Sequence, residues 1–285
     1  MLAAARAPPS DGFHVIASGE DDGVPFLLAV PSGGGPPSRV ALEGAFAWRV
    51  SGPRTCVGRW DAGHHVPCPG QTAVGAEACC LPCSGLETPD CVFEPRCASD
   101  PASCHCPFGP VPHAVYVAFY GPLAKVGLTQ EWRVPLRLRE QGADAYFVAS
   151  RQPDRAAARA AERALSFLYG VPEFRTPREI LPQMARPVDW DLVAARAEAM
   201  RARLAERGAA PGPVVRVEDH LVSQPLPGAP RRVQPFGRHA GTWLGLKGQN
   251  LFYAAPGRLD VGRQAVAAIK LRDLLGRTVT PGDDA

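Results

Sequence analysis

Residues 113–129 read His113-Ala-Val-Tyr116-Val-Ala-Phe-Tyr120-Gly-Pro-Leu-Ala-Lys125-Val-Gly127-Leu-Thr129, and this stretch decides the fold. Two β-prone runs, 114–119 and 124–128, are joined by Tyr-Gly-Pro-Leu, a sequence typical of a hairpin turn. All nine cysteines come before this stretch, between Cys56 and Cys106. A predicted β-hairpin therefore follows directly on a cysteine-rich segment, and we expect the function to lie at this junction.

The residues after the hairpin alternate between helical and strand patterns. A helix is predicted through 133–140, where Pro135 is tolerated near the first turn, and a strand follows at 145–149. Residues 153–168 have a helix-favouring composition, with Asp154 in the first turn. Four apolar residues are expected on one face of that helix: Ala158, Ala161, Leu165 and Leu168. A further helix over 189–207 ends at Gly208, so the predicted order after the cysteines is β-β-α-β-α.

Both ends of the chain favour strands. Residues 12–50 alternate short apolar runs with Gly/Pro turns, and the runs 214–221, 241–246 and 250–253 have the same character. We expect these terminal strands to pair into one small β-domain, which gives an α+β fold class. The expected organisation is a β segment over 1–55, a zinc-binding region over 56–112, an α/β core over 113–208 and a β-rich segment over 209–285.

The composition sets limits on the class of protein. Hydrophobic residues make up 46% of the 285 residues, so most of the chain is expected to fold. The net charge is only +3, and of the 31 basic residues only three are lysines, a bias that a GC-rich genome also produces. There is no run of about 18 apolar residues and no apolar signal core at the N-terminus, so we expect a cytoplasmic protein with no membrane partner.

The cysteines are predicted to bind zinc, because a reducing compartment disfavours disulfides and zinc prefers four thiolate or imidazole ligands. Eight cysteines suffice for two structural sites, and Cys80 is preferred to Cys79 because it completes a two-residue spacing with Cys83. One zinc with several free thiols, or an iron–sulfur cluster, are the alternatives. His64, His65 and His105 could each replace a cysteine. The predicted ligands are Cys56, Cys68, Cys80, Cys83, Cys91, Cys97, Cys104 and Cys106.

The hairpin and the helices after it resemble the GIY-YIG nuclease superfamily over residues 114–168. The first triplet is Ala114-Val115-Tyr116, and the second is Lys125-Val126-Gly127 with Thr129 behind it. The arginine of that superfamily corresponds to Arg137, within Arg-Leu-Arg-Glu-Gln-Gly, and the glutamate to Glu162. The chain from Cys56-Val-Gly-Arg to Gly245-Leu-Lys-Gly-Gln also resembles a zinc-knot family, the domain of unknown function 2797.

The resemblance implies a site for phosphodiester hydrolysis. Glu162 would hold one Mg²⁺ or Mn²⁺, Tyr116 would position or deprotonate the attacking water, and Arg137 would hold the phosphate as a planar fork. Gly127 would let the backbone approach the scissile group, with Thr129 beside it. Lys125 stands where the superfamily has a second tyrosine; it supplies positive charge but is a poorer proton acceptor.

Three functions follow from this pattern. The first is a zinc-stabilised protein that processes DNA or RNA, by metal-dependent hydrolysis if the chemistry is retained. The second is a catalytically silent nucleic-acid-binding module, and the third is a scaffold recruited to small-molecule chemistry, which the low net charge favours. Under the first two, arginines within 133–139 and 155–163 are expected to face a phosphate backbone, so that binding weakens steeply with salt.

Overall fold

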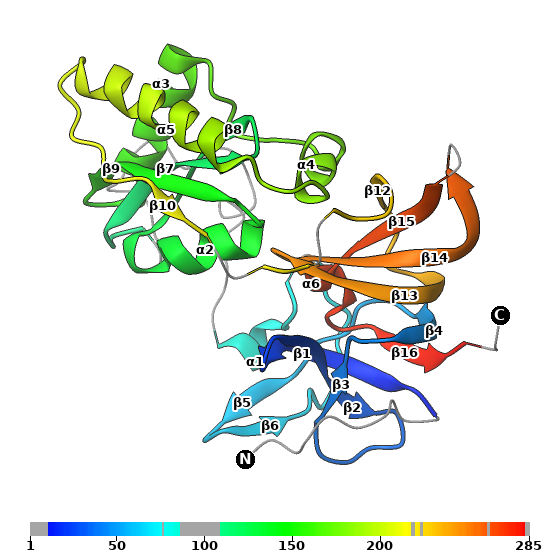
Figure 1. Cartoon of the computed structure of the whole chain (residues 1–285). Coiled ribbons are helices and arrows are strands. Elements are labelled where there is room, and N and C mark those ends of the chain that lie inside the picture. The colour runs from blue at the N-terminus through cyan, green and yellow to red at the C-terminus, as the bar shows by residue number, and fades with distance from the viewer. Residues whose placement is uncertain are drawn as a thin grey trace. The chain divides into compact units, whose positions relative to one another are not determined.

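The computed structural model describes residues 11–75, 77–85, 109–217, 220–222, 225–260 and 263–282. The chain divides into two compact units (Figure 1). Unit 1 comprises Met1–Glu87 and Leu221–Ala285, and unit 2 comprises Thr88–His220. Unit 1 is built mainly of strands and unit 2 of a sheet with helices, which confirms the predicted α+β class. Among the described residues, no helix combines the length and apolar character that crossing a membrane requires.

Unit 1 is built on a ten-stranded sheet to which both ends of the chain contribute. The strands of the first segment are β1 (Phe13–Asp21), β2 (Val24–Pro31), β3 (Ser38–Ala41) and β4 (Ala45–Ser51). The second segment gives β11 (Leu221–Val222), β12 (Pro230–Arg232), β13 (Gly237–Lys247), β14 (Asn250–Asp260), β15 (Arg263–Lys270) and β16 (Thr278–Pro281). The order is β12-β15-β14-β13-β4-β16-β1-β2-β3, with β11 on β13. Strand β4 pairs with both β13 and β16, so the two segments are joined through hydrogen bonds at the centre of the sheet.

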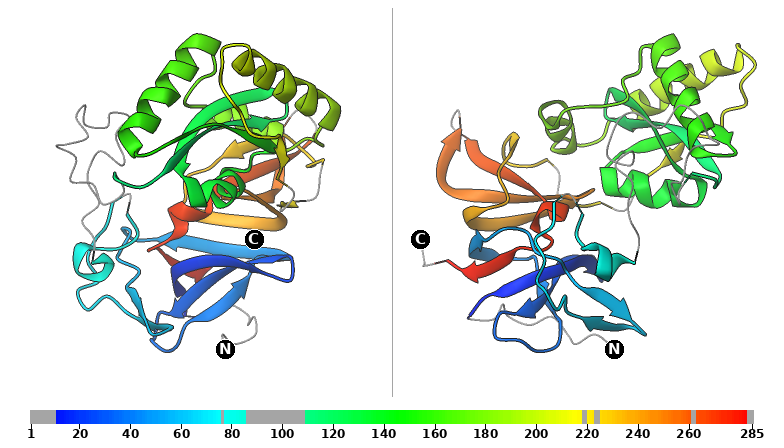
Figure 2. Two further views of the ribbon diagram at one scale, coloured as in Figure 1. Left: turned by 90° about the vertical axis from the view of Figure 1, so that its left-hand side faces the viewer. Right: turned by 180° about the vertical axis from the view of Figure 1, so that it is seen from behind.

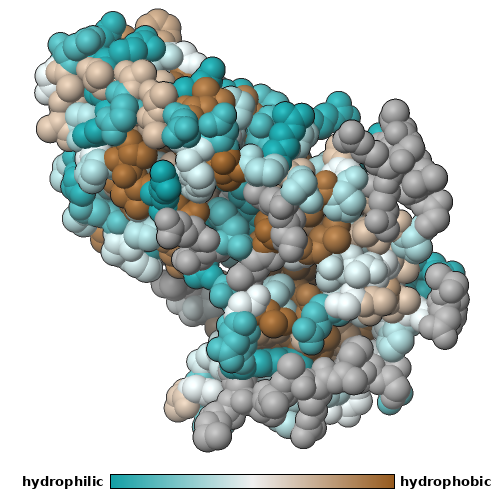
Figure 3. All heavy atoms as spheres, in the orientation of Figure 1, coloured by the Kyte–Doolittle hydropathy of each residue, from teal (hydrophilic) through white to brown (hydrophobic). Residues whose placement is uncertain are grey.

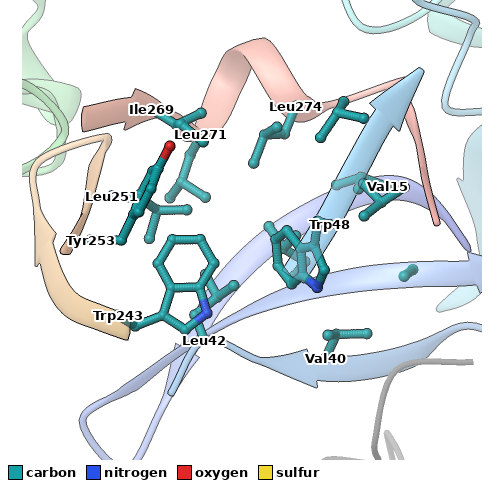
Figure 4. Close-up of a cluster of buried hydrophobic side chains, with 14 of the residues drawn as sticks. Val15, Val40, Leu42, Trp48, Trp243, Leu251, Tyr253, Ile269, Leu271 and Leu274 are labelled. Carbon is teal, nitrogen blue, oxygen red and sulfur yellow. The ribbon is translucent and has the colours of Figure 1, made fainter. Parts of the chain in front are cut away.

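Aromatic residues from the paired strands form the centre of the unit 1 core (Figure 4). The rings of Phe46 on β4 and Trp243 on β13 stack with centroids 3.8 Å apart. Trp48 and Tyr253 meet Trp243 at steeper angles, and Leu274 of the short helix α6 (Leu271–Leu274) is fully buried beside them. These side chains bury large apolar areas, which accounts for the pairing of strands far apart in sequence.

The cysteine-rich part of unit 1 has little regular structure among its described residues. It contains the two-stranded sheet of β5 (Arg59–Asp61) and β6 (His64–Val66), and the short helix α1 (Leu81–Ser84). Arg54 connects it to the large sheet, since its Nε donates to the Leu275 carbonyl at 2.9 Å and its Nη1 to the Gly75 carbonyl at 2.7 Å. These two hydrogen bonds fix the start of the cysteine-rich segment against the residues that precede β16.

Unit 2 is a four-stranded sheet with helices on both sides (Figure 1, Figure 2). Its strands lie in the order β10-β9-β7-β8. They are β7 (His113–Tyr120), β8 (Leu123–Gln130), β9 (Ala145–Gln152) and β10 (Val215–Arg216). The helices are the 3-10 turn η3 (Glu131–Arg133), α2 (Val134–Gln141), α3 (Arg155–Tyr169), α4 (Pro177–Met184) and α5 (Trp190–Ala205). The predicted hairpin is confirmed as β7 and β8, which pair antiparallel along their whole length.

Helix α3 begins where the sequence predicts, but its buried face departs from the expected one at Glu162 and Leu168. Asp154 caps it by accepting a hydrogen bond from the Ala157 amide at 2.8 Å. Ala158 and Leu165 are buried as expected, but Leu168 is 50% exposed and Glu162 is only 4% exposed. At about 100° per residue, Glu162 lies about 40° to one side of Ala158, whereas Leu168 lies about 80° to the other side. Leu168, at the edge of the expected apolar face, is thus exposed, and a carboxylate is buried beside that face.

Candidate functional site

Four cysteines of unit 1 come together in one cluster: Cys56, Cys68, Cys80 and Cys83. Cys68 follows β6, while Cys80 and Cys83 lie at the start of α1 and within it. All four Sγ atoms lie within 4.8 Å of one another. The zinc–sulfur bond of about 2.3 Å places the sulfurs of a tetrahedral site about 3.8 Å apart, and the Sγ atoms of Cys68 and Cys80 are 3.8 Å apart.

The surroundings of the cluster act on its thiols in different directions, and burial raises the pKa of Cys83 to about 12. The Sγ of Cys56 accepts hydrogen bonds from the Cys80 amide at 3.2 Å and the Gly58 amide at 3.4 Å. The backbone amide of Thr72 lowers the pKa of Cys68 to about 6, whereas burial raises the pKa of Cys56. Four thiolates cannot be ionised side by side without a cation between them, so the donor set fits a metal that prefers sulfur.

The neighbouring side chains that could have replaced a cysteine are used elsewhere. The Cys79 thiol donates to the Gly58 carbonyl at 3.4 Å, and Cys79 is not among the four. His65 bonds through Nε2 to the Val57 carbonyl at 2.6 Å. Within the part of the chain that the structure describes, the site therefore consists of four sulfurs. Cys91, Cys97, Cys104, Cys106 and His105, on which the second zinc site depends, lie outside the described residues.

In unit 2, Tyr116 lies at the centre of a second, polar cluster. It is 1% exposed and stands directly opposite Gly127 in the β7–β8 pair. A Cβ added to Gly127 would lie 2.6 Å from the Tyr116 hydroxyl oxygen and 2.7 Å from Cζ. The missing side chain of Gly127 thus leaves the space that the tyrosine ring occupies. Thr129 lies two residues beyond, opposite Ala114.

Gln141, the last residue of α2, joins three side chains of this cluster. Its Nε2 donates to the Tyr116 hydroxyl at 2.9 Å. Its Oε1 accepts from the Tyr120 hydroxyl at 3.0 Å and from the Lys125 Nζ at 3.4 Å. One amide therefore fixes two buried hydroxyls and one ammonium group relative to one another.

Two charged groups act on the Tyr116 hydroxyl. Burial raises the pKa of Tyr116, and the neighbouring Arg137 opposes that rise. The charge of Glu162 adds to the rise. The net direction keeps Tyr116 protonated at neutral pH, so it is suited to donating a hydrogen bond and poorly suited to accepting a proton.

Glu162 itself is held by an arginine. Burial raises the pKa of Glu162, while Arg159 and, more weakly, Lys125 lower it. Arg159 forms an ion pair with Glu162 one turn away and a second with Glu173, at 3.5 Å. The guanidinium therefore lies between two carboxylates, and a divalent ion at Glu162 would have to displace it.

Gln141 thus links Tyr116 to Lys125, while Arg137 and Glu162 act electrostatically on the Tyr116 hydroxyl. Sequence reasoning missed Gln141, Tyr120 and Arg159. Each of them stands at a spacing that places it beside a predicted site residue. Gln141 follows Arg137 by four residues on a helix, and Arg159 precedes Glu162 by three on another helix, so each pair shares a helix face. Tyr120 follows Tyr116 by four residues on a strand, so the two rings lie on the same face of the sheet.

Comparisons with curated proteins and with solved structures gave no match. A family model described as "Protein of unknown function (DUF2797)" matches residues 45–264, which include the four clustered cysteines and all of the polar cluster. The match covers more than half of the chain, and the chain therefore belongs to the DUF2797 family.

Proposed function

We propose that unit 2 binds nucleic acid in the manner of a GIY-YIG nuclease and hydrolyses a phosphodiester bond, and that unit 1 carries structural zinc. The observation that supports the first part is that Tyr116, Lys125, Arg137 and Glu162, from two strands and two helices, are linked through Gln141 or act on one another electrostatically. Two cations beside a neutral hydroxyl and a buried carboxylate are a combination that suits a phosphate with its attacking water.

Each residue has a role that its surroundings support. Arg137 and Lys125 would neutralise the phosphoryl oxygens, with Lys125 held in place by Gln141. Tyr116 would orient the water by hydrogen bonding, since the raised pKa of its hydroxyl disfavours the tyrosinate. Glu162 is the residue that would hold Mg²⁺ or Mn²⁺, an ion that lowers the pKa of a bound water when present.

The ion pair of Glu162 with Arg159 favours a second candidate function, a nucleic-acid-binding module without catalysis. In that case the carboxylate stays neutralised by the arginine and the cluster binds phosphate through Lys125 and Arg137 alone. Both candidates require the same cations and differ in whether Glu162 exchanges Arg159 for a metal.

The cysteine cluster supports the zinc proposal through its donor set. Four sulfurs leave no open position for a water, so the metal stabilises the segment and takes no part in hydrolysis. Clustered thiols of this kind fit a reducing compartment such as the cytoplasm.

The two candidates are separated by cleavage of single- and double-stranded DNA and RNA with Mg²⁺ or Mn²⁺. Hydrolysis predicts metal-dependent cleavage that Glu162→Gln abolishes and that Tyr116→Phe reduces strongly, with zinc content unchanged. Glu198→Gln, the same change at an exposed helix position of unit 2, serves as the control. Binding without cleavage would establish the silent module. The absence of both binding and cleavage would favour the small-molecule alternative.

A further inference from the structure

Unit 2 contains a cavity of about 330 Å³ that the polar cluster does not use. It lies between helix α2 and the strands β9 and β10. Its walls include Pro135, Leu136, Arg139, Tyr146, Val215 and Arg216. On the visible face of unit 2, hydrophobic residues occur in small groups among hydrophilic ones (Figure 3). The cavity walls likewise combine apolar and charged residues.

The walls combine apolar surface with one guanidinium group. Leu136 is 48% exposed, and Tyr146 presents an aromatic ring that is almost fully buried. Arg216 pairs with Ala145 and lies over the ring of Trp190, with its Cζ 4.6 Å from the centroid, so its guanidinium is directed to the opposite face of the sheet. The guanidinium of Arg139, on α2, is the cationic group of the cavity walls. A ligand that is planar, apolar on its faces and linked to a negative group matches these walls.

The cavity lies on the same face of the sheet as the polar cluster. Val215, Tyr146, Ala118 and Lys125 are paired in turn across the four strands, and directly paired residues point to the same side. Tyr146 and Lys125 are two strand spacings apart, roughly 10 Å. Helix α2 contributes residues to both the cluster and the cavity. Arg137 and Gln141, four residues apart, belong to the cluster. Pro135 and Arg139, also four residues apart, line the cavity.

We propose that the cavity holds one unpaired nucleotide of the strand whose phosphate lies at the Tyr116 cluster. This inference rests on the proposed function and specifies its substrate as single-stranded or frayed nucleic acid. The volume is at the lower end for small-molecule sites and suits one base, whereas a base within a duplex is stacked and cannot enter. Tyr146 and Leu136 contact the base, and Arg139 contacts the adjoining phosphate.

The test measures binding of fluorescently labelled single strands and of the matching duplex to the full chain. Leu136→Glu places a negative charge at the cavity, and Leu192→Glu makes the same change at an exposed position of α5 as the control. We expect Leu136→Glu to weaken single-strand binding about tenfold, since one stacked base contributes that much or more. Duplex binding should fall less, and Leu192→Glu should have no effect.

Arg137→Gln distinguishes failure of the cavity proposal from failure of the proposed function. If it weakens binding while Leu136→Glu does not, the cavity proposal is overturned and the proposed function stands. If Leu136→Glu weakens the binding of a nucleoside monophosphate while Arg137→Gln changes nothing, the cavity binds nucleotides but the proposed function fails. Equal losses for single strand and duplex would overturn the assignment of an unpaired base, and the absence of all binding would overturn both proposals.

Discussion

The cysteine cluster of unit 1 and the polar cluster of unit 2 are both buried groups of reactive side chains, but they differ in how their atoms are satisfied. The four sulfurs gather at one point, where backbone amides donate to Cys56, and a cation is what would neutralise them as thiolates. In unit 2 each polar group already has a partner: Gln141 serves Tyr116, Tyr120 and Lys125, and Arg159 serves Glu162. A cluster of groups that all suit one kind of ion indicates its ligand more directly than a cluster whose charges are already paired with one another.

The largest expected effect concerns the cysteines. We predict that Cys80→Ala removes one zinc per chain and destroys the order of residues 54–85, because apparent binding energies of structural zinc are roughly 10 kcal/mol or more and this segment has little core to replace them. Elemental analysis together with amide hydrogen exchange measures both quantities.

Cys79→Ala is the matched control, since Cys79 lies next to Cys80 in sequence but outside the cluster. It should retain the full zinc content. Equal loss of metal in both variants would contradict the assignment of Cys80 rather than Cys79 as a ligand. A wild-type protein that contains no zinc would contradict the zinc site itself.

The next effect tests the packing of the polar cluster. Gly127→Ala places a Cβ less than 3 Å from the Tyr116 ring, so we expect a displaced tyrosine and a loss of about 1–3 kcal/mol in the free energy of unfolding. Gly212→Ala in the same unit meets nothing closer than 3.6 Å and should be neutral within about 0.5 kcal/mol. Urea unfolding measures both, and equal effects would show that the ring does not depend on Gly127.

A smaller effect lies in the pH dependence of two glutamates. Burial raises the pKa of Glu162, so its charge costs stability above the folded pKa and this penalty disappears as the pH falls below about 4.5. The hydrogen bond from the Thr176 amide lowers the pKa of Glu179 to about 2, so Glu179 contributes stability above its ordinary pKa that is lost as the pH falls towards 2.

Compared with their Gln variants, the two positions should therefore change in opposite directions. As the pH is lowered from 7 to 4.5, wild type should gain stability relative to Glu162→Gln. As the pH is lowered further below 4.5, wild type should lose stability relative to Glu179→Gln. Hydrogen exchange of the β7 amides reports on unit 2 at each pH. The same direction at both positions would mean that Glu162 is not a buried, destabilised carboxylate.

Local sequence patterns predicted much of unit 2. The hairpin, α2, α3 and α5 follow from β-prone runs, a capping Asp and helical composition, all of which act over a few residues. Helix α4 had no predicted counterpart, although Thr176 and Glu179 form a capping box that was readable in the sequence.

Long-range features were harder to predict. The strand order of unit 1 depends on contacts such as Phe46 with Trp243, which are almost 200 residues apart and leave no local pattern. The convergence on Tyr116 was expected only through the resemblance. The burial of Glu162 beside Arg159 depends on how α3 packs against the sheet, which periodicity alone does not predict.

The most direct test of the central claim, that the Tyr116 cluster binds the phosphates of a nucleic acid, is the salt dependence of binding. Affinity for labelled single-stranded DNA and RNA is measured over a range of salt for wild type, Arg137→Gln and Arg201→Gln, whose arginine lies on α5 away from the cluster. We predict binding that weakens steeply with salt, with a slope of log affinity against log salt that is smaller by about one in Arg137→Gln and unchanged in Arg201→Gln. No binding at low salt, or the same slope in all three proteins, would contradict the account.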